Sequence, residues 1–148
     1  MGNLKNNNLD IASQLGFTMR HVVKMFERIF LDRNLDITPE QFWIMDMLTQ
    51  KEESIQADIA EMFNKDKSAI MRYIDVMEEK HWVARMSDRT DRRKKILVVT
   101  KQGNEKLEAA KLIIEQAMST IVGNLKADEI KTFLTVLEKI RMQSEITK

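Results

Sequence analysis

The side chains best suited to chemistry lie in one short, strongly basic segment. Between residues 85 and 95, six cations stand against two anions, a local net charge of +4. Residues that favour β-strands flank this segment, so residues 83–86 and 96–100 are predicted to pair as strands joined by a charged tip. A basic ribbon of this kind suits the narrow, strongly negative minor groove of DNA. The alternative is a solvated hairpin whose charges protect a sheet edge from aggregation.

Two short helices are predicted directly before this ribbon. Residues 54–63 carry an apolar face at helical spacing, and Asp66 is placed to cap a second helix over about residues 66–80. The second helix is expected to bury Ile70, Ile74 and Met77, and to expose Lys67, Ser68, Met71, Arg72 and Asp75. Two short helices joined by so few residues are typical of a helix-turn-helix.

Longer helices must position these elements. Apolar spacing predicts a helix over about residues 10–33, with a stripe too wide for one neighbouring surface. Thr38 and Gln41 are spaced for a capping box at the start of the next helix. Two further helices are predicted over about residues 101–123 and 127–145. Because its apolar stripe is so wide, the helix over residues 10–33 is expected to be central or to meet a second subunit.

Composition limits the class of protein. The 148 residues, 43% hydrophobic and 32% charged, fit one soluble, helix-rich domain with a real core. The absence of cysteine excludes disulfides, thiolate metal sites and a cysteine redox sensor. No apolar run is long enough to span a membrane, and the N-terminus lacks the apolar core of a signal peptide. A cytoplasmic protein without membrane contact, metal or other cofactor is expected.

The order of elements and several short motifs resemble the MarR (multiple antibiotic resistance regulator) family of winged-helix transcription factors. The resemblance covers nearly the whole chain and is strongest over residues 37–103. The segments that carry it are Ile37-Thr38-Pro39-Glu40-Gln41, Asp66-Lys67-Ser68-Ala69-Ile70-Met71-Arg72, Met77-Glu78-Glu79-Lys80-His81-Trp82-Val83-Ala84-Arg85, Asp91-Arg92-Arg93 and Val99-Thr100-Lys101-Gln102-Gly103. The chain departs from the family pattern at His81, where glycine is usual, and at Ala69 and Met71, which replace hydroxyl residues.

The resemblance implies a fold and an assembly. The fold is mainly α with a small β-ribbon wing, and it has about six helices and two to three short strands in one domain over residues 1–148. A winged-helix DNA-binding lobe spans about residues 37–100, and dimerisation helices span about 10–36 and 101–148. A homodimer of this kind binds a pseudo-palindromic double-stranded operator, usually as a repressor.

The resemblance also implies which residues contact DNA. In the recognition helix they are Lys67, Ser68, Ala69, Met71 and Arg72, and in the wing they are Arg85, Arg89, Asp91, Arg92, Arg93 and Lys94. Asp91 is expected to orient the wing by pairing with Arg85 or with an arginine of the tip. Arg72 has an alternative as a solvated charge paired with an aspartate, Ser68 as a helix cap, and Met71 as a packing residue, which is favoured for Met71.

Members of this family commonly bind a small aromatic or phenolic ligand between the dimerisation helices and the DNA-binding lobe. The residues expected to line such an effector pocket are Phe17, His21, Phe26, Phe42, Trp43 and Met47. Packing in the core is the alternative for each of them.

Two other classes of function compete with this interpretation. The chain is not expected to be an enzyme, because it has no cysteine nucleophile, only two histidines far apart in sequence, and no glycine-rich phosphate loop. A winged helix that binds protein and not DNA is the stronger alternative, because residues 38–84 carry a net charge of −5.

Overall fold

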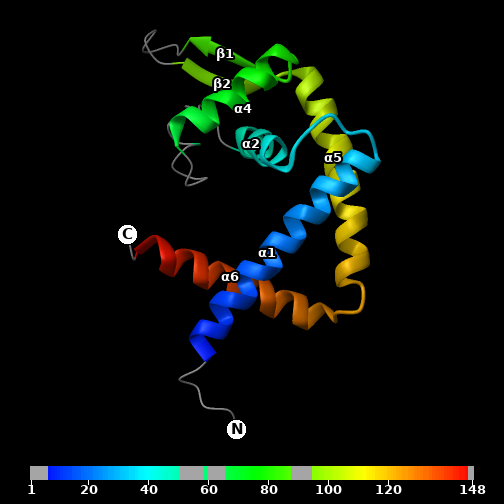
Figure 1. Cartoon of the computed structure of the whole chain (residues 1–148), viewed down its shortest axis with the longest axis vertical. Helices are drawn as coiled ribbons and strands as arrows, with labels where there is room; N and C mark the ends of the chain where they lie inside the picture. Colours follow the sequence, from blue (N-terminus) through cyan, green and yellow to red (C-terminus); the bar gives the residue numbers. More distant parts are fainter. Residues whose placement is uncertain (1–6, 51–58, 60–65, 88–94, 147–148) are drawn as a thin grey trace. The chain divides into compact units, whose positions relative to one another are not determined.

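The computed structural model describes residues 7–50, 59, 66–87 and 95–146 (Figure 1). This part of the chain forms five helices and one antiparallel pair of strands, which confirms the predicted fold class. In the labels of Figure 1 the elements are α1 (Asn7–Asp32), α2 (Pro39–Gln50), α4 (Lys67–Glu79), β1 (Val83–Ser87), β2 (Lys95–Val99), α5 (Lys101–Val122) and α6 (Ala127–Ile146). The helix predicted over residues 54–63 and the tip of the ribbon lie outside the described residues.

The chain divides into two compact units, Met1–Lys111 and Leu112–Lys148. The first unit contains α1, α2, α4, both strands and the first half of α5. The second contains the rest of α5 and all of α6. The predicted division into dimerisation helices and a DNA-binding lobe stays a prediction.

Helix α2 is the central helix of the first unit. Its predicted capping box is present: the Thr38 backbone N–H donates to Gln41 Oε1 at 3.0 Å, and the Gln41 N–H donates to Thr38 Oγ1 at 3.2 Å. The helix contacts α1, α4 and β2, and an ion pair of 3.2 Å joins Asp46 to Lys111 of α5. Its buried residues are Pro39, Gln41, Phe42, Ile44, Met45, Met47 and Leu48. The core of the first unit is therefore built around α2.

Helix α1 is buried only toward its C-terminal end. Phe26 and Phe30 are buried, and the Phe30 ring meets Phe42 of α2 edge to face with the ring centroids 6.3 Å apart. The helix ends where Asn34 takes a left-handed conformation, with φ of 53°, and Leu35 N–H donates to the Phe30 carbonyl. The predicted wide stripe is thus only partly covered within the chain, because Phe17 and other apolar side chains nearer the N-terminus are exposed.

Helix α4 leads into the ribbon through a tight left-handed turn. His81 has φ of 59°, its N–H donates to Glu78 O at 2.9 Å, and Trp82 N–H donates to Met77 O at 2.8 Å. These two bonds form a Schellman motif with histidine at the position that favours glycine. The strands then pair from Val83 with Val99 to Ser87 with Lys95. The bounds of each strand differ by one residue from those predicted.

The second strand ends one residue earlier than predicted because Thr100 takes another role. Its N–H donates to the Trp82 carbonyl at 2.9 Å, and its hydroxyl accepts from Gly103 N–H at 3.0 Å. Thr100 therefore caps α5. None of the helices in the described ranges is both long and apolar enough to cross a membrane.

Candidate nucleic-acid interface

The N-terminus of α4 is organised by the carboxylate of Asp66. Asp66 Oδ1 accepts a hydrogen bond of 2.8 Å from Ala69 N–H, which confirms the predicted N-cap, and a further bond from the Ser68 hydroxyl. The Ser68 bond first, and the Ala69 bond after it, hold the pKa of Asp66 below its ordinary value. Ser68 thus donates its hydroxyl hydrogen to the cap, and its oxygen can still accept a bond from a base or another donor.

Helix α4 has one apolar and one polar face, as predicted. Its buried residues are Ile70, Ile74 and Met77. Its exposed residues include Lys67, Ser68, Met71, Arg72 and Asp75. Ala69, the remaining residue of α4 that is predicted to contact DNA, is half-buried. The expectation that Met71 packs into the core is wrong, because 47% of its surface is exposed on this face.

Arg85 joins the ribbon to the recognition helix. Its guanidinium donates to Asp75 Oδ1 at 2.6 Å and also to the carboxylate of Glu78, both on α4. The hydrogen bond with Asp75 is the main reason that the pKa of Arg85 is raised. Asp75 is therefore paired with Arg85 and not with Arg72, and the strand β1 is tied to α4. A DNA contact by Arg85 itself stays a prediction.

The other residues predicted in the wing lie outside the described part of the chain. They are Arg89, Asp91, Arg92, Arg93 and Lys94. The described base of the ribbon ends at Lys95, whose ammonium donates to Ser87 Oγ at 2.7 Å across the two strands. The expected pairing of Asp91 with Arg85 stays a prediction, and the two acids that Arg85 is seen to contact are on α4.

The six residues predicted to line an effector pocket have different surroundings. Phe26, Phe42 and Met47 are buried in the first unit, and the Phe42 ring lies 4.8 Å from the ring of Trp43, which is partly exposed. Phe17 and His21 are exposed on α1, where His21 Nδ1 lies 2.8 Å from the Phe17 carbonyl oxygen. None of the six lines the groove at the C-terminal end of α1.

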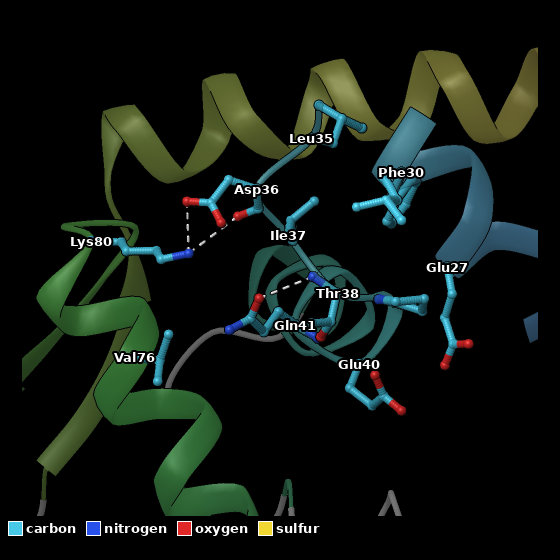
Figure 2. Close-up of a pocket in the computed structure, with 12 residues that line it drawn as sticks. Glu27, Phe30, Leu35, Asp36, Ile37, Thr38, Glu40, Gln41, Val76 and Lys80 are labelled. Carbon is cyan, nitrogen blue, oxygen red and sulfur yellow. Dashed lines mark hydrogen bonds and ion pairs between the residues drawn. The ribbon is translucent and has the colours of Figure 1, made fainter. Parts of the chain in front are cut away.

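The first unit has a groove of about 510 Å³ at the C-terminal end of α1 (Figure 2). The connection from α1 to α2, the first turn of α2 and the C-terminal half of α4 form its other walls. Lys80 closes one end through an ion pair of 2.7 Å with Asp36 (Figure 2). This groove was not predictable from the sequence, because its lining comes from three separate segments. Gln41, which lines it, is recognisable in the sequence only as part of a capping box.

A recognition helix capped at Asp66, followed at once by an antiparallel ribbon tied back to it, defines a winged-helix protein. The family model of the MarR family matches residues 37–95, the part that contains these elements. Over residues 37–95 the chain is therefore similar to the MarR family.

Two curated relatives are named as regulators. The chain is 28% identical over 105 residues to the uncharacterized HTH-type transcriptional regulator YdgJ of Bacillus subtilis (strain 168), over 71% of this chain and 64% of that protein. The match therefore spans less than two thirds of that relative's own length. The chain is also 27% identical over 139 residues to the HTH-type transcriptional repressor NicR of Pseudomonas putida, over 93% of this chain and 88% of that protein.

Solved structures show the same fold. The transcriptional regulator BldR from Sulfolobus solfataricus has a TM-score of 0.86 at 20% identity, over 96% of this chain and 99% of that chain. A mutant of MarR from E. coli complexed with operator DNA has a TM-score of 0.76 at 21% identity, over 94% of this chain and 99% of that chain.

Proposed function

We propose that this chain is a transcriptional regulator that binds double-stranded DNA as a homodimer and acts as a repressor. The observation that carries the proposal is the outward face of α4, where Lys67, Ser68 and Arg72 are exposed while the opposite face is buried. An α-helix with such a face fits the major groove of B-DNA. The relatives named as regulators and the similar fold bound to operator DNA support the proposal.

Arg72 and Ser68 are the residues proposed to read bases. A guanidinium can donate two hydrogen bonds to O6 and N7 of guanine, which discriminates against other bases by about 1–3 kcal/mol. Arg72 is exposed, and its positive charge helps to lower the pKa of Asp66 at the helix start. The carboxylate of Asp75 is engaged by Arg85, so it does not compete for Arg72 among the described residues. Ser68 presents an acceptor oxygen at the same end of the helix.

The ribbon is proposed to reach the minor groove while α4 occupies the major groove. Arg93 is the residue proposed to enter the minor groove, on the strength of its match to the family's Asp-x-Arg motif, and it lies outside the described residues. The contacts of Arg85 with Asp75 and Glu78 support the proposal, because they fix β1 against the recognition helix. The two elements would then approach DNA as one unit.

A homodimer is proposed because both ends of the chain expose apolar helical faces. Phe17 on α1 and Phe133 on α6 are each more than half exposed. Two-fold symmetry would require a pseudo-palindromic operator with half-sites about 34 Å apart. The proposal includes a cytoplasmic location.

The test is a selection of bound sequences from random duplex DNA, followed by anisotropy titrations on the selected site. Arg72→Ala is expected to weaken binding at least fivefold and to relax base preference at one position in each half-site. Arg33→Ala, which removes an exposed arginine just after α1, is the matched control and should leave affinity unchanged. Arg93→Ala is expected to weaken binding at least tenfold. If about six phosphates are neutralised per dimer, log K falls with log salt with a slope of about −5.

A protein-interaction module without DNA binding is the second candidate, supported by the net charge of −5 over residues 38–84. Binding to random duplex DNA distinguishes the two candidates. A DNA-binding regulator binds random duplex in a salt-sensitive manner, and a protein-interaction module does not. Absence of binding to every duplex in dilute buffer would reject the proposed function.

Regulation by a small aromatic or phenolic ligand is the finer part of the proposal. Of the six residues predicted for it, Phe26, Phe42 and Met47 are buried and are accounted for by core packing. Trp43, Phe17 and His21 remain available at the surface. A ligand that favours one spacing of the two DNA-binding lobes would change DNA affinity by its differential binding to the two states.

A further inference from the structure

The groove between α1, α2 and α4 holds a buried amide whose N–H donors have no acceptor among the described residues. Gln41 is only 5% exposed, and its Oε1 accepts the Thr38 N–H of the capping box. Among the described residues its amide nitrogen has no hydrogen-bond partner. Figure 2 shows this nitrogen pointing away from Thr38, toward the side of the groove that Val76 of α4 lines. A buried donor without a partner is costly, and a ligand oxygen in the groove would satisfy it.

Two carboxylates at the rim of the same groove have no ion-pair partner within the described part of the chain. Glu27 of α1 and Glu40 of α2 both line it, and neither forms an ion pair with another described residue. Figure 2 shows both carboxylates on the same side of the groove. The remaining acid, Asp36, is matched by Lys80. The charge left over in the lining is therefore negative, which favours a cationic ligand.

Apart from Thr38, the rest of the lining is apolar. Phe30, Leu31 and Ile37 lie toward α1, and Val76 lies on α4. A cavity of about 510 Å³ is within the range of sites that hold small organic molecules, in which an apolar lining surrounds a few polar groups. The groove therefore fits a ligand that has an apolar body, an acceptor oxygen and a positive charge.

We propose that this groove binds a small organic ammonium compound that carries an apolar body and a carbonyl-type oxygen. The carbonyl oxygen accepts from Gln41 Nε2, the apolar body covers Leu31 and Val76, and the ammonium group lies at Glu27 and Glu40. Binding of such a ligand does not require DNA binding, whereas its use as an effector rests on the proposed function.

The position of the groove provides a route from ligand to DNA affinity. Val76 and Lys80 belong to the C-terminal end of the recognition helix and its cap, and the Lys80–Asp36 ion pair ties that end to the α1–α2 connection. A ligand wedged between Val76 and α2 bears directly on how α4 is held. A state with α4 displaced binds DNA differently, so the ligand and DNA are coupled.

The first experiment is calorimetry on the full chain with procaine as probe, because procaine has an aromatic ring, an ester carbonyl and a tertiary ammonium group. Benzocaine shares the ring and the ester and lacks the ammonium, and salicylate represents phenolic acids. Procaine is expected to bind with one site per chain, and benzocaine at least tenfold more weakly. Equal affinity for procaine and benzocaine, no binding of procaine, or binding of salicylate alone would overturn the proposal.

Variants locate the site. Glu27→Gln combined with Glu40→Gln is expected to weaken procaine binding about fivefold, since two exposed ion pairs are lost. Glu105→Gln removes an exposed acid that does not line the groove and should leave binding unchanged. Val76→Phe fills the groove and should abolish procaine binding. Should Val76→Phe fail to fold, the charge variants decide, because they change only rim side chains; unaltered procaine affinity in the double variant overturns the proposal.

The last measurement separates this proposal from the proposed function. The affinity for a selected DNA site is measured with and without saturating procaine, and it is expected to change at least threefold in the parent protein and not in Val76→Phe. Procaine binding without any DNA binding would uphold the groove and reject the proposed function. DNA binding that procaine leaves unchanged, despite calorimetric binding, would overturn the role of the groove in regulation.

Discussion

The backbone of His81 adopts a conformation that suits glycine better than any residue with a side chain. Its φ of 59° lies in the left-handed region, and two hydrogen bonds of the Schellman motif hold it there. Glycine would remove the clash of Cβ with the backbone but would add freedom to the unfolded chain. The sequence departs from the pattern of the MarR family at this position, and the left-handed turn nevertheless forms with histidine.

Substitution of His81 by glycine is therefore expected to stabilise the protein. The expected gain is about 0.5–1 kcal/mol in the free energy of unfolding, because relief of the left-handed strain exceeds the added entropy. Urea denaturation measures it. Glu79→Gly, two residues earlier in the last turn of α4, is the control and should destabilise. A destabilised His81→Gly variant would mean that the imidazole makes a contribution larger than the strain.

Asp66 makes the start of the recognition helix sensitive to acid. Its pKa is lower in the folded protein than in the unfolded chain, chiefly because of the Ser68 hydroxyl and the Ala69 N–H. The stabilisation by the ionised cap is thus fully present above the ordinary aspartate pKa of about 3.9, and it is lost as pH falls through the lower folded value. Neutral pH leaves the cap intact.

Two substitutions of Asp66 separate the cap from its charge. Asp66→Ala is expected to lower Tm at pH 7 by roughly 2–4 °C, because one helix-end donor loses its acceptor. Asp66→Asn keeps an acceptor oxygen but carries no charge. As the pH falls from about 5 to about 3, this variant should therefore lose less stability than the parent protein loses. Thermal melts followed by circular dichroism over this range give both values. Parallel pH profiles for the parent and Asp66→Asn would contradict the assigned cause of the acid sensitivity.

The elements of the first unit meet at places where very small side chains are required. Gly103 lies in the first turn of α5, and a Cβ built there would stand 2.0 Å from the carbonyl oxygen of Trp82. That carbonyl also accepts from Thr100 N–H, so a shift of the carbonyl would break this hydrogen bond. The close approach holds the start of α5 against the residue that precedes β1.

Gly103→Ala is expected to destabilise the protein by about 2 kcal/mol, because overpacking outweighs the better helix propensity of alanine. Gly16→Ala is the matched control within α1. Its new Cβ would find only Arg20 Nη2, at 3.8 Å, so the variant should be more stable by about 0.5–1 kcal/mol. Urea denaturation of both variants checks the pair. Equal stabilities of Gly103→Ala and Gly16→Ala would show that α5 shifts to accommodate the new Cβ.

Much of the fold was predictable from local signals. The capping box of Thr38 and Gln41, the cap at Asp66 and the buried side of α4 each follow from residues within a few positions of one another. The ribbon was predictable because apolar residues flank a charged segment, and its strand bounds differ by one residue from those predicted. Such short-range patterns depend on the backbone's own hydrogen bonds.

Contacts between distant segments could not be predicted in the same way. Arg85 was expected at DNA, and the acids it contacts are Asp75 and Glu78, seven to ten residues away on another element. The groove around Gln41 is formed by three helices, so no single stretch of sequence predicts it. The outward position of Met71 was predictable from the helical spacing of Ile70 and Ile74, and only the packing favoured for its side chain was wrong.

At the scale of the whole molecule, the helices toward both ends of the described chain expose large apolar side chains. Along α6 the half-exposed side chains include Phe133, Leu134 and Val136. Contiguous exposed apolar surface marks an interaction site in most proteins. The wide stripe of α1 led to the same expectation from sequence, and its N-terminal part is indeed uncovered within the chain. Dimerisation through these faces is the assembly that the proposed function requires.

Phe133 of α6 is the side chain whose substitution tests this assembly. Phe133 is 56% exposed in the chain, and a symmetric interface would bury it twice, once in each subunit. Phe133→Glu is therefore expected to weaken dimerisation at least 100-fold, about 2.7 kcal/mol, through two lost apolar contacts and two introduced charges. Sedimentation equilibrium measures the dimer constant, with Thr132→Glu as a control that adds the same charge one residue away. Loss of operator binding should follow loss of the dimer, because a single lobe contacts only one half-site. A parent protein that sediments as a monomer at micromolar concentration would remove the basis for the two-fold operator.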